Sequence, residues 1–128
     1  MYLESMKFSL SDDSNSFTIR AYDHGEVVVN EHHHSNSVIV MPNRVIDNWA
    51  PQTFDDLMED HFALISELEP QLVILGTGEE QLFPKPALYA VLLNQGIGVE
   101  VMTTPAACRT YNILVSEGRR VAAALLLI

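Results

Sequence analysis

Three short runs of mainly aliphatic residues in the second half of the chain constrain its fold more than any other feature. They span residues 72–75 (LVIL), 99–102 (VEVM) and 120–128 (RVAAALLLI). A strand that helices cover on both faces has a nearly continuous apolar sequence, whereas a half-exposed strand alternates apolar and polar residues. We therefore expect three strands in a largely buried sheet.

Helical segments separate these runs. Residues 87–95 suit a helix that ends at Gly96, because glycine readily adopts the left-handed conformation found at helix C-termini. Thr104 and Pro105 are typical of an N-cap and a first helical position, and they predict a helix that Gly118 ends. The alternation of strands and helices favours a layered α/β sheet.

The first half of the chain has stronger β signals. Residues 17–22 and 26–29 are rich in β-forming residues and are separated by Asp-His-Gly, which predicts a hairpin. Residues 37–41 (SVIVM) predict another short strand, which Pro42 stops. The α/β sheet is thus expected to have a β-rich addition at its start.

The expected domain organisation is simple. A chain of 128 residues suits one domain with a proper core. Because the polar stretch LSDDSNS buries little, we expect a flexible lead-in at residues 1–15 and a single α/β domain at residues 16–128.

The segment 53–69 has the clearest helical pattern, with apolar residues recurring every three or four positions. Thr53 and Asp56 have the spacing of a helix N-terminus, and Pro70 ends the pattern. His61 falls on the apolar stripe, where we interpret it as a hydrogen-bonded histidine at the core or its rim.

The charge is strongly acidic and unevenly distributed. The formal net charge is −10, and residues 1–69 contain 13 of the 17 acidic residues but only 3 of the 7 Lys and Arg residues. Such a chain has no electrostatic attraction as a whole to nucleic acid or to an anionic membrane, so we expect neither as a partner. The acidic half is interpreted as a solvated face or as a surface that attracts a basic partner.

A reducing cytoplasm is the location expected from the remaining composition, and a processed organellar protein would have the same features. Cys108 is the single cysteine, which excludes an internal disulfide. The first ten residues lack the apolar core of a secretory signal and the arginines of a mitochondrial transit peptide. The longest wholly apolar run is far shorter than the roughly 20 residues of a membrane-spanning helix.

One candidate site is the loop Gly76, Thr77 and Gly78, which directly follows the LVIL run. Open α/β sheets bind ligands at the carboxyl ends of their strands. The loop is not a dinucleotide fingerprint, because Gln81 occupies the position of the third glycine and the two glutamates after the loop would repel a phosphate. No cofactor is indicated.

The densest polar cluster is the TPAACRTYN segment, whose candidate residues are Thr104, Cys108, Arg109 and Asn112. By the same sheet logic, this helix start should lie beside the Gly76 loop and form a crevice that could hold an anion or a carbonyl group. Cys108 is either activated there by Arg109 or is a small buried hydrophobic residue. The Asn112 side chain discriminates between architecture, if it bonds to backbone, and a binding role, if it points into an open cleft.

His32, His33 and His34 are a weak metal candidate. In an extended strand His32 and His34 face one side and His33 faces the other, which leaves no complete ligand set. No metal is predicted, and a polar edge strand is the preferred interpretation.

The same segments resemble a known family, the small proteins related to mitochondrial complex I assembly factor 3. The resemblance covers about residues 16–128. The histidine run matches no family feature, and together with the lack of a targeting segment it favours a bacterial-type member. The segments that carry the resemblance are TIRAY, MP, GTG after LVIL, FP, GVEVM, TPAACRTYNIL and EGR.

The resemblance implies a fold and a kind of function. The implied fold is a compact three-layer α/β domain, in which helices and a small additional N-terminal sheet flank a mixed central sheet. Family members in mitochondria act through protein contacts during assembly, so the leading hypothesis is a non-enzymatic accessory protein that binds another protein. The alternative is a small-molecule-binding protein or an enzyme that uses the crevice of the GTG loop and the TPAACRTYN helix start. The sequence identifies neither the partner nor the oligomeric state.

Overall fold

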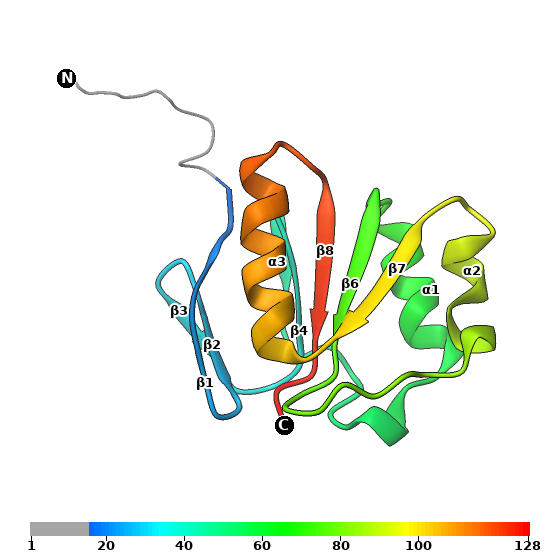
Figure 1. The fold of residues 1–128 in the computed structure, drawn as a ribbon, viewed down its shortest axis with the longest axis horizontal. Helices are drawn as coiled ribbons and strands as arrows, with labels where there is room; N and C mark the ends of the chain where they lie inside the picture. Colours follow the sequence, from blue (N-terminus) through cyan, green and yellow to red (C-terminus); the bar gives the residue numbers. More distant parts are fainter. Residues whose placement is uncertain (1–15) are drawn as a thin grey trace.

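A computed structural model describes residues 16–128 of the chain, and the predicted lead-in at residues 1–15 lies outside this part. The described elements follow one another around a central sheet (Figure 1). In chain order they are β1 (Ile19–Asp23), β2 (Glu26–Val29), β3 (His32–His34), β4 (Val38–Met41), β5 (Arg44–Ile46), η2 (Phe54–Asp56), α1 (Glu59–Glu67), β6 (Leu72–Gly76), η3 (Pro86–Tyr89), α2 (Ala90–Leu93), β7 (Gly98–Met102), α3 (Thr104–Ser116) and β8 (Val121–Leu125).

Two sheets form the framework. The larger has five strands in the order β5-β4-β8-β6-β7, and the smaller is an antiparallel sheet in the order β1-β2-β3. In the larger sheet β8, β6 and β7 run parallel, while β4 and β5 are antiparallel to their neighbours. The mixed central sheet and the small N-terminal sheet confirm the expected fold class.

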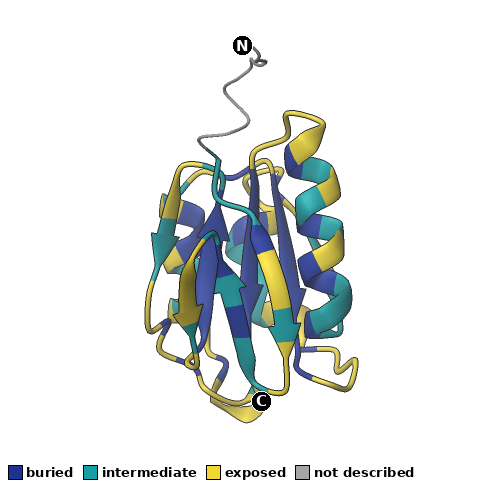
Figure 2. Ribbon diagram, turned by 90° about the vertical axis from the view of Figure 1, so that its left-hand side faces the viewer, coloured by how far each residue is buried: buried dark blue, intermediate teal, exposed yellow. Residues whose placement is uncertain are grey.

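Helices and the small sheet cover the two faces of the larger sheet. One face packs against α3 and the small sheet, and the other packs against α1 and α2 (Figures 1 and 2). Every residue of β6 and β8 is buried, as their apolar sequences predict. Successive side chains of β6 point to opposite faces, so Ile74 joins the α3 side of the core and Val73 the α1 side.

The N-terminal hairpin matches its prediction. His24 and Gly25 both have positive φ, 39° and 84°, and form the two-residue turn between β1 and β2. The histidine run is the edge strand β3, in which His32 and His34 pair with buried Val29 and Val27. Their side chains therefore face the inside of the sheet, whereas His33 faces outward.

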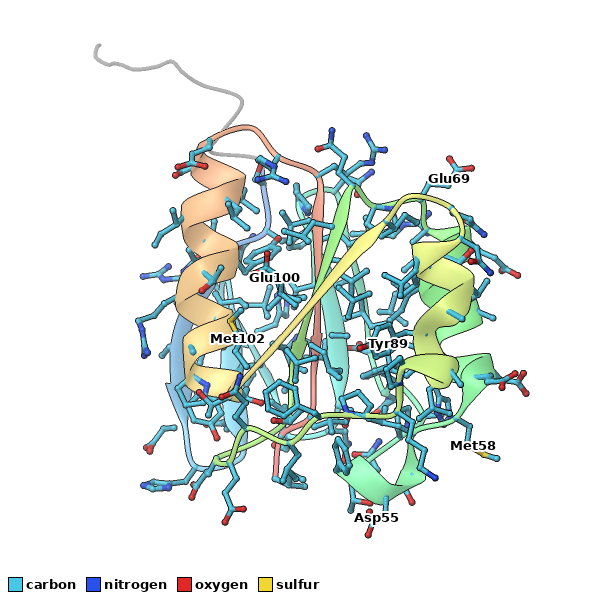
Figure 3. The ribbon with its side chains drawn as sticks, turned by 45° about the vertical axis from the view of Figure 1, so that its right-hand side comes forward. Asp55, Met58, Glu69, Tyr89, Glu100 and Met102 are labelled. Carbon is cyan, nitrogen blue, oxygen red and sulfur yellow. The ribbon has the colours of Figure 1, made fainter. Side chains whose placement is uncertain are left out.

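The prediction of one continuous helix over 53–69 was wrong for the first part of this segment. The chain forms the short turn η2, becomes extended at Met58 and only then enters α1. The Asp56 carboxylate accepts the backbone N–H of Thr53 at 3.1 Å and closes η2, and His61 Nδ1 accepts the Met58 N–H at 3.0 Å at the start of α1. Met58 is 63% exposed and leaves the apolar stripe (Figure 3).

Three smaller boundaries also differ from the predictions. The N-cap of α3 is Thr103, whose hydroxyl accepts the Ala106 N–H at 3.3 Å, so the prediction of Thr104 as the cap was wrong by one residue. The segment predicted as a helix over 87–95 is α-helical only in α2, after the turn η3. The short strand β5 was not predicted, because a three-residue segment shows too little alternation.

Candidate functional site

The Gly76 loop and the start of α3 are in direct contact. The Thr104 hydroxyl accepts the Gly78 N–H at 2.8 Å and donates to the Leu126 carbonyl at 2.7 Å. The Gly78 carbonyl in turn accepts the Thr104 N–H at 2.8 Å. A Cβ at Gly76 would lie 2.9 Å from the Thr104 hydroxyl oxygen, which is closer than real Cβ contacts. Thr104 therefore fills the space between the two segments that the sequence predicted to border a crevice.

Thr77 organises the rest of the loop. Its buried hydroxyl donates to the Glu80 carbonyl at 2.6 Å and accepts the Leu82 N–H at 3.1 Å. These two bonds fold residues 78–82 into a turn that is anchored in the core. Directly after this turn, the Phe83 side chain is 71% exposed.

Asn112 bonds to the backbone of the first strand. Its Oδ1 accepts the Ile19 N–H at 2.9 Å, and its Nδ2 donates to the Ile19 carbonyl at 2.7 Å. The preceding residue, Tyr111, donates a hydrogen bond from its hydroxyl to the Phe17 carbonyl at 2.8 Å. The two side chains join α3 to the small sheet, which gives this part of the TPAACRTYN segment an architectural role.

Cys108 has the properties of a buried structural thiol. Its residue is only 6% exposed, and burial raises the pKa of the thiol to about 12, an effect that the nearby Arg109 guanidinium only partly offsets. The thiolate is the nucleophilic form of cysteine, so burial disfavours the reactive form of this side chain. Burial raises the pKa of the Tyr111 phenol in the same way.

Cys108, Arg109 and Asn112 do come together, in a hollow between α3 and β1 of about 290 Å³ that we call the seam pocket. Gly76, Thr77, Gly78 and Thr104 are not among its lining residues. The lining is Ile19, Arg20, Ala21, Tyr22, Pro105, Cys108, Arg109 and Asn112. The four lining residues from β1 were not predicted as part of a site, although all four lie in the TIRAY segment.

The histidines do not form a metal centre in the described part of the chain. His34 Nδ1 lies 2.8 Å from Asp47 Oδ1, and His33 Nδ1 lies 3.3 Å from Glu26 Oε2. Among residues 16–128 no group of three His, Cys, Asp or Glu side chains could hold a metal ion. His32 and His34 instead line a hollow of about 470 Å³ between the small sheet and β5.

Residues 19–126 match the family described as protein of unknown function (DUF498/DUF598). The chain belongs to this family. The chain is also similar to a Bos taurus protein named NADH dehydrogenase (ubiquinone) 1 alpha subcomplex assembly factor 3, which is 34% identical over 110 residues that cover 84% of this chain and 59% of that protein. The resemblance to complex I assembly factor 3 is therefore confirmed, over about three-fifths of the length of that relative.

Bacterial proteins are similar to this chain at comparable identity. The 13 kDa major membrane protein of Francisella tularensis is 30% identical over 105 residues, covering 80% of this chain and 84% of that protein. A Bordetella parapertussis crystal structure has 37% identity and a TM-score of 0.83 over 88% of this chain and 97% of that one. A Bordetella pertussis structure, described as a Mth938-like domain, has 31% identity and a TM-score of 0.77 over 95% and 92%.

None of the helices in residues 16–128 has the length and apolar character that crossing a bilayer requires.

Proposed function

We propose that this DUF498/DUF598 protein is an accessory protein of the assembly type, which acts through contacts with another protein. The family relationship to complex I assembly factor 3 supports this proposal. The contact surface would be the loop after β6, because it holds an exposed aromatic side chain on a turn that the core anchors. Rigid aromatic anchors of this kind supply much of the binding energy of protein interfaces.

The chemistry of the loop suggests the kind of partner. Phe83 is 71% and Leu82 is 36% exposed, and the exposed residues Glu79 and Glu80 lie earlier in the same loop. A complementary surface would have an apolar pocket for the phenyl ring and lysine or arginine side chains at its rim. The acidic surface of the chain would speed the encounter with such a partner.

Site-specific photo-cross-linking in native cells tests this proposal. A photoreactive phenylalanine analogue replaces Phe83 in one variant and Ile113 in a matched control, because Ile113 is 58% exposed on the separate helix α3. We expect one discrete partner to be cross-linked from position 83, to be absent from position 113, and to co-purify with the wild-type chain at moderate salt. Identical products from both positions, or no partner that survives moderate salt, would contradict the proposal.

A second candidate function is the binding or conversion of a small molecule at the TPAACRTYN helix start. The observation that favours it is the seam pocket, where three of the predicted residues meet β1. Its size is at the lower end of the range for small-molecule sites, roughly 300 to 1,000 Å³.

A further inference from the structure

The edge of β1 offers backbone groups to the seam pocket. Asp23 and Glu26 flank a two-residue turn and therefore form a hydrogen-bonded pair, so the next pair, Tyr22 and Val27, is of the non-bonded type. The N–H and C=O of Tyr22 consequently point away from β2, toward the free edge of the strand. Ile19 presents its N–H and C=O to the same edge.

Asn112 occupies only one of these two positions. Its amide group bonds to the N–H and C=O of Ile19 as a neighbouring strand would. Among the hydrogen bonds formed within residues 16–128, none involves the outward N–H or C=O of Tyr22. Since Tyr22 lines the seam pocket, this hollow has one backbone donor and one backbone acceptor available to a ligand.

Two arginines supply positive charge to the same hollow. Arg20 comes from the β-bulge of β1, where the register with β2 shifts between Ile19 and Ala21, and Arg109 comes from the exposed side of α3. The whole chain has only 7 Lys and Arg residues against 17 acidic residues. None of the lining residues is acidic, and neither arginine makes an ion pair with another described residue.

The remaining walls of the seam pocket are apolar. Ile19, Ala21, Pro105 and the Cys108 thiol complete the lining. The thiol is held in its neutral form by burial, so it adds no negative charge. A ligand would therefore combine an anionic group with a short apolar or neutral body.

We propose that the seam pocket binds a small organic oxyanion, a carboxylate or a phosphate ester, between the guanidinium groups of Arg20 and Arg109 and the Tyr22 N–H. Guanidinium groups bind both oxyanions through paired hydrogen bonds, and the planar fork suits this geometry better than an ammonium group does. The Tyr22 carbonyl accepts a hydroxyl or N–H of the ligand body. The proposal specifies the ligand class of the second candidate function and is independent of partner binding at Phe83.

Amide NMR titrations of the full-length, uniformly ¹⁵N-labelled chain test this assignment. The two probes are inorganic phosphate and succinate, each added at fixed pH and at an ionic strength held constant with sodium chloride. We expect at least one probe to give saturable shifts of the Tyr22 amide and of the amides around Arg20 and Arg109. Saturation by phosphate alone assigns phosphate esters, and saturation by succinate alone assigns carboxylates.

Charge-removal variants identify the site. Arg20→Gln and Arg109→Gln should each weaken the binding at least about ten-fold, since a hydrogen bond to a charged group contributes this much. Arg119→Gln is the matched control, because it removes the same charge from an exposed residue outside the pocket. Unchanged amide shifts elsewhere in the spectrum establish that each variant is folded.

Three results would overturn the proposal. The first is amide shifts that fail to saturate with either probe. The second is that Arg119→Gln weakens the binding as much as Arg20→Gln and Arg109→Gln do, and the third is binding of unchanged strength in both Arg20→Gln and Arg109→Gln. None of these results changes the expected cross-linking from position 83, so the failure of the anion site and the failure of the accessory function remain distinguishable.

Discussion

Replacement of Asn112 tests whether α3 and the small sheet are joined as the structure indicates. Asn112→Ala removes both hydrogen bonds to Ile19, whose residue is 5% exposed, and leaves its N–H and C=O without a partner. Each bond contributes about 0.5–1.5 kcal/mol, and leaving a buried group unsatisfied raises the cost. We expect the free energy of unfolding to fall by about 2–3 kcal/mol.

Equilibrium urea unfolding followed by circular dichroism measures this loss, and amide hydrogen exchange locates it. The Ile19 amide should lose its protection in Asn112→Ala beyond the global change in stability. Ser116→Ala is the matched control on α3, because the Ser116 hydroxyl bonds only to the carbonyl of Ile113 at the exposed helix surface. The control should change the stability by less than about 0.5 kcal/mol.

The Asn112→Asp variant makes the test sharper. Its carboxylate would keep the bond from the Ile19 N–H but would place a negative oxygen against the Ile19 carbonyl, where Nδ2 now donates at 2.7 Å. Because a protonated carboxyl can donate there, its folded-state pKa would be raised, and its stability deficit would shrink as the pH falls through that pKa. A pH-independent deficit, or an Asn112→Ala loss below about 0.5 kcal/mol, would refute the reasoning.

Three further outcomes follow from the packing. Gly76→Ala should destabilise the fold by about 1–3 kcal/mol in thermal unfolding because its Cβ would meet Thr104 at 2.9 Å, whereas Gly98→Ala, which faces only a Leu side-chain tip at 3.2 Å, should cost less. The Cys108 thiol, with a pKa raised to about 12 by burial, should react with a thiol reagent at neutral pH only as fast as the chain opens, and rapid labelling of the native chain would contradict this. Backbone N–H groups hold the pKa of the Asp56 carboxyl below its ordinary value of 3.8. The wild-type chain should therefore be more stable than Asp56→Asn above pH 3.8. Acid unfolding should show this advantage disappear as the pH falls through the folded-state pKa of Asp56, which lies below 3.8.

The layered sheet could be predicted because its central strands β6 and β8 are short and wholly buried. The runs 72–75 and 121–125 have no polar residue that would oppose burial on both faces, and a parallel pair needs a helical crossover between its strands. The hairpin was equally predictable, because Gly25 permits the positive φ that its turn requires. Sequence spacing therefore specifies the central layers well.

Side-chain to backbone bonds explain what could not be predicted. The apolar periodicity continues through Met58, but the Asp56 carboxylate and the His61 ring bond to nearby N–H groups and divide the predicted helix into two pieces. Thr103 and Thr104 could each cap α3 through a hydroxyl group. Because the bonds of Thr104 to Gly78 and Leu126 engage its hydroxyl in the core, Thr103 is the residue that caps the helix. The Thr104 bonds are tertiary contacts that no local pattern contains, whereas the Asp56 and His61 bonds are local but compete with an equally local apolar periodicity.

The same limit applies to the candidate site. From the order of strands and helices in the sequence, Arg109 is expected beside the Gly76 loop, because both follow the carboxyl ends of neighbouring strands. The structure instead fills that position with Thr104 and places Arg109 in the same pocket as Arg20, which is 89 positions away in the chain. No spacing rule pairs two residues that far apart, so the seam pocket is visible only in three dimensions.

The charge distribution separates the two proposed surfaces by partner type. The chain has a net charge of −10, so an oxyanion approaching from a distance is repelled, and only the short-range contacts of Arg20 and Arg109 can favour its binding. A basic protein surface is attracted at long range and would meet Glu79 and Glu80 on the same loop as Phe83. Added salt screens both long-range effects, so it should slow association of the protein partner and remove the barrier to the anion. The opposite responses of the two association rates to salt would distinguish the two surfaces even before either ligand is identified.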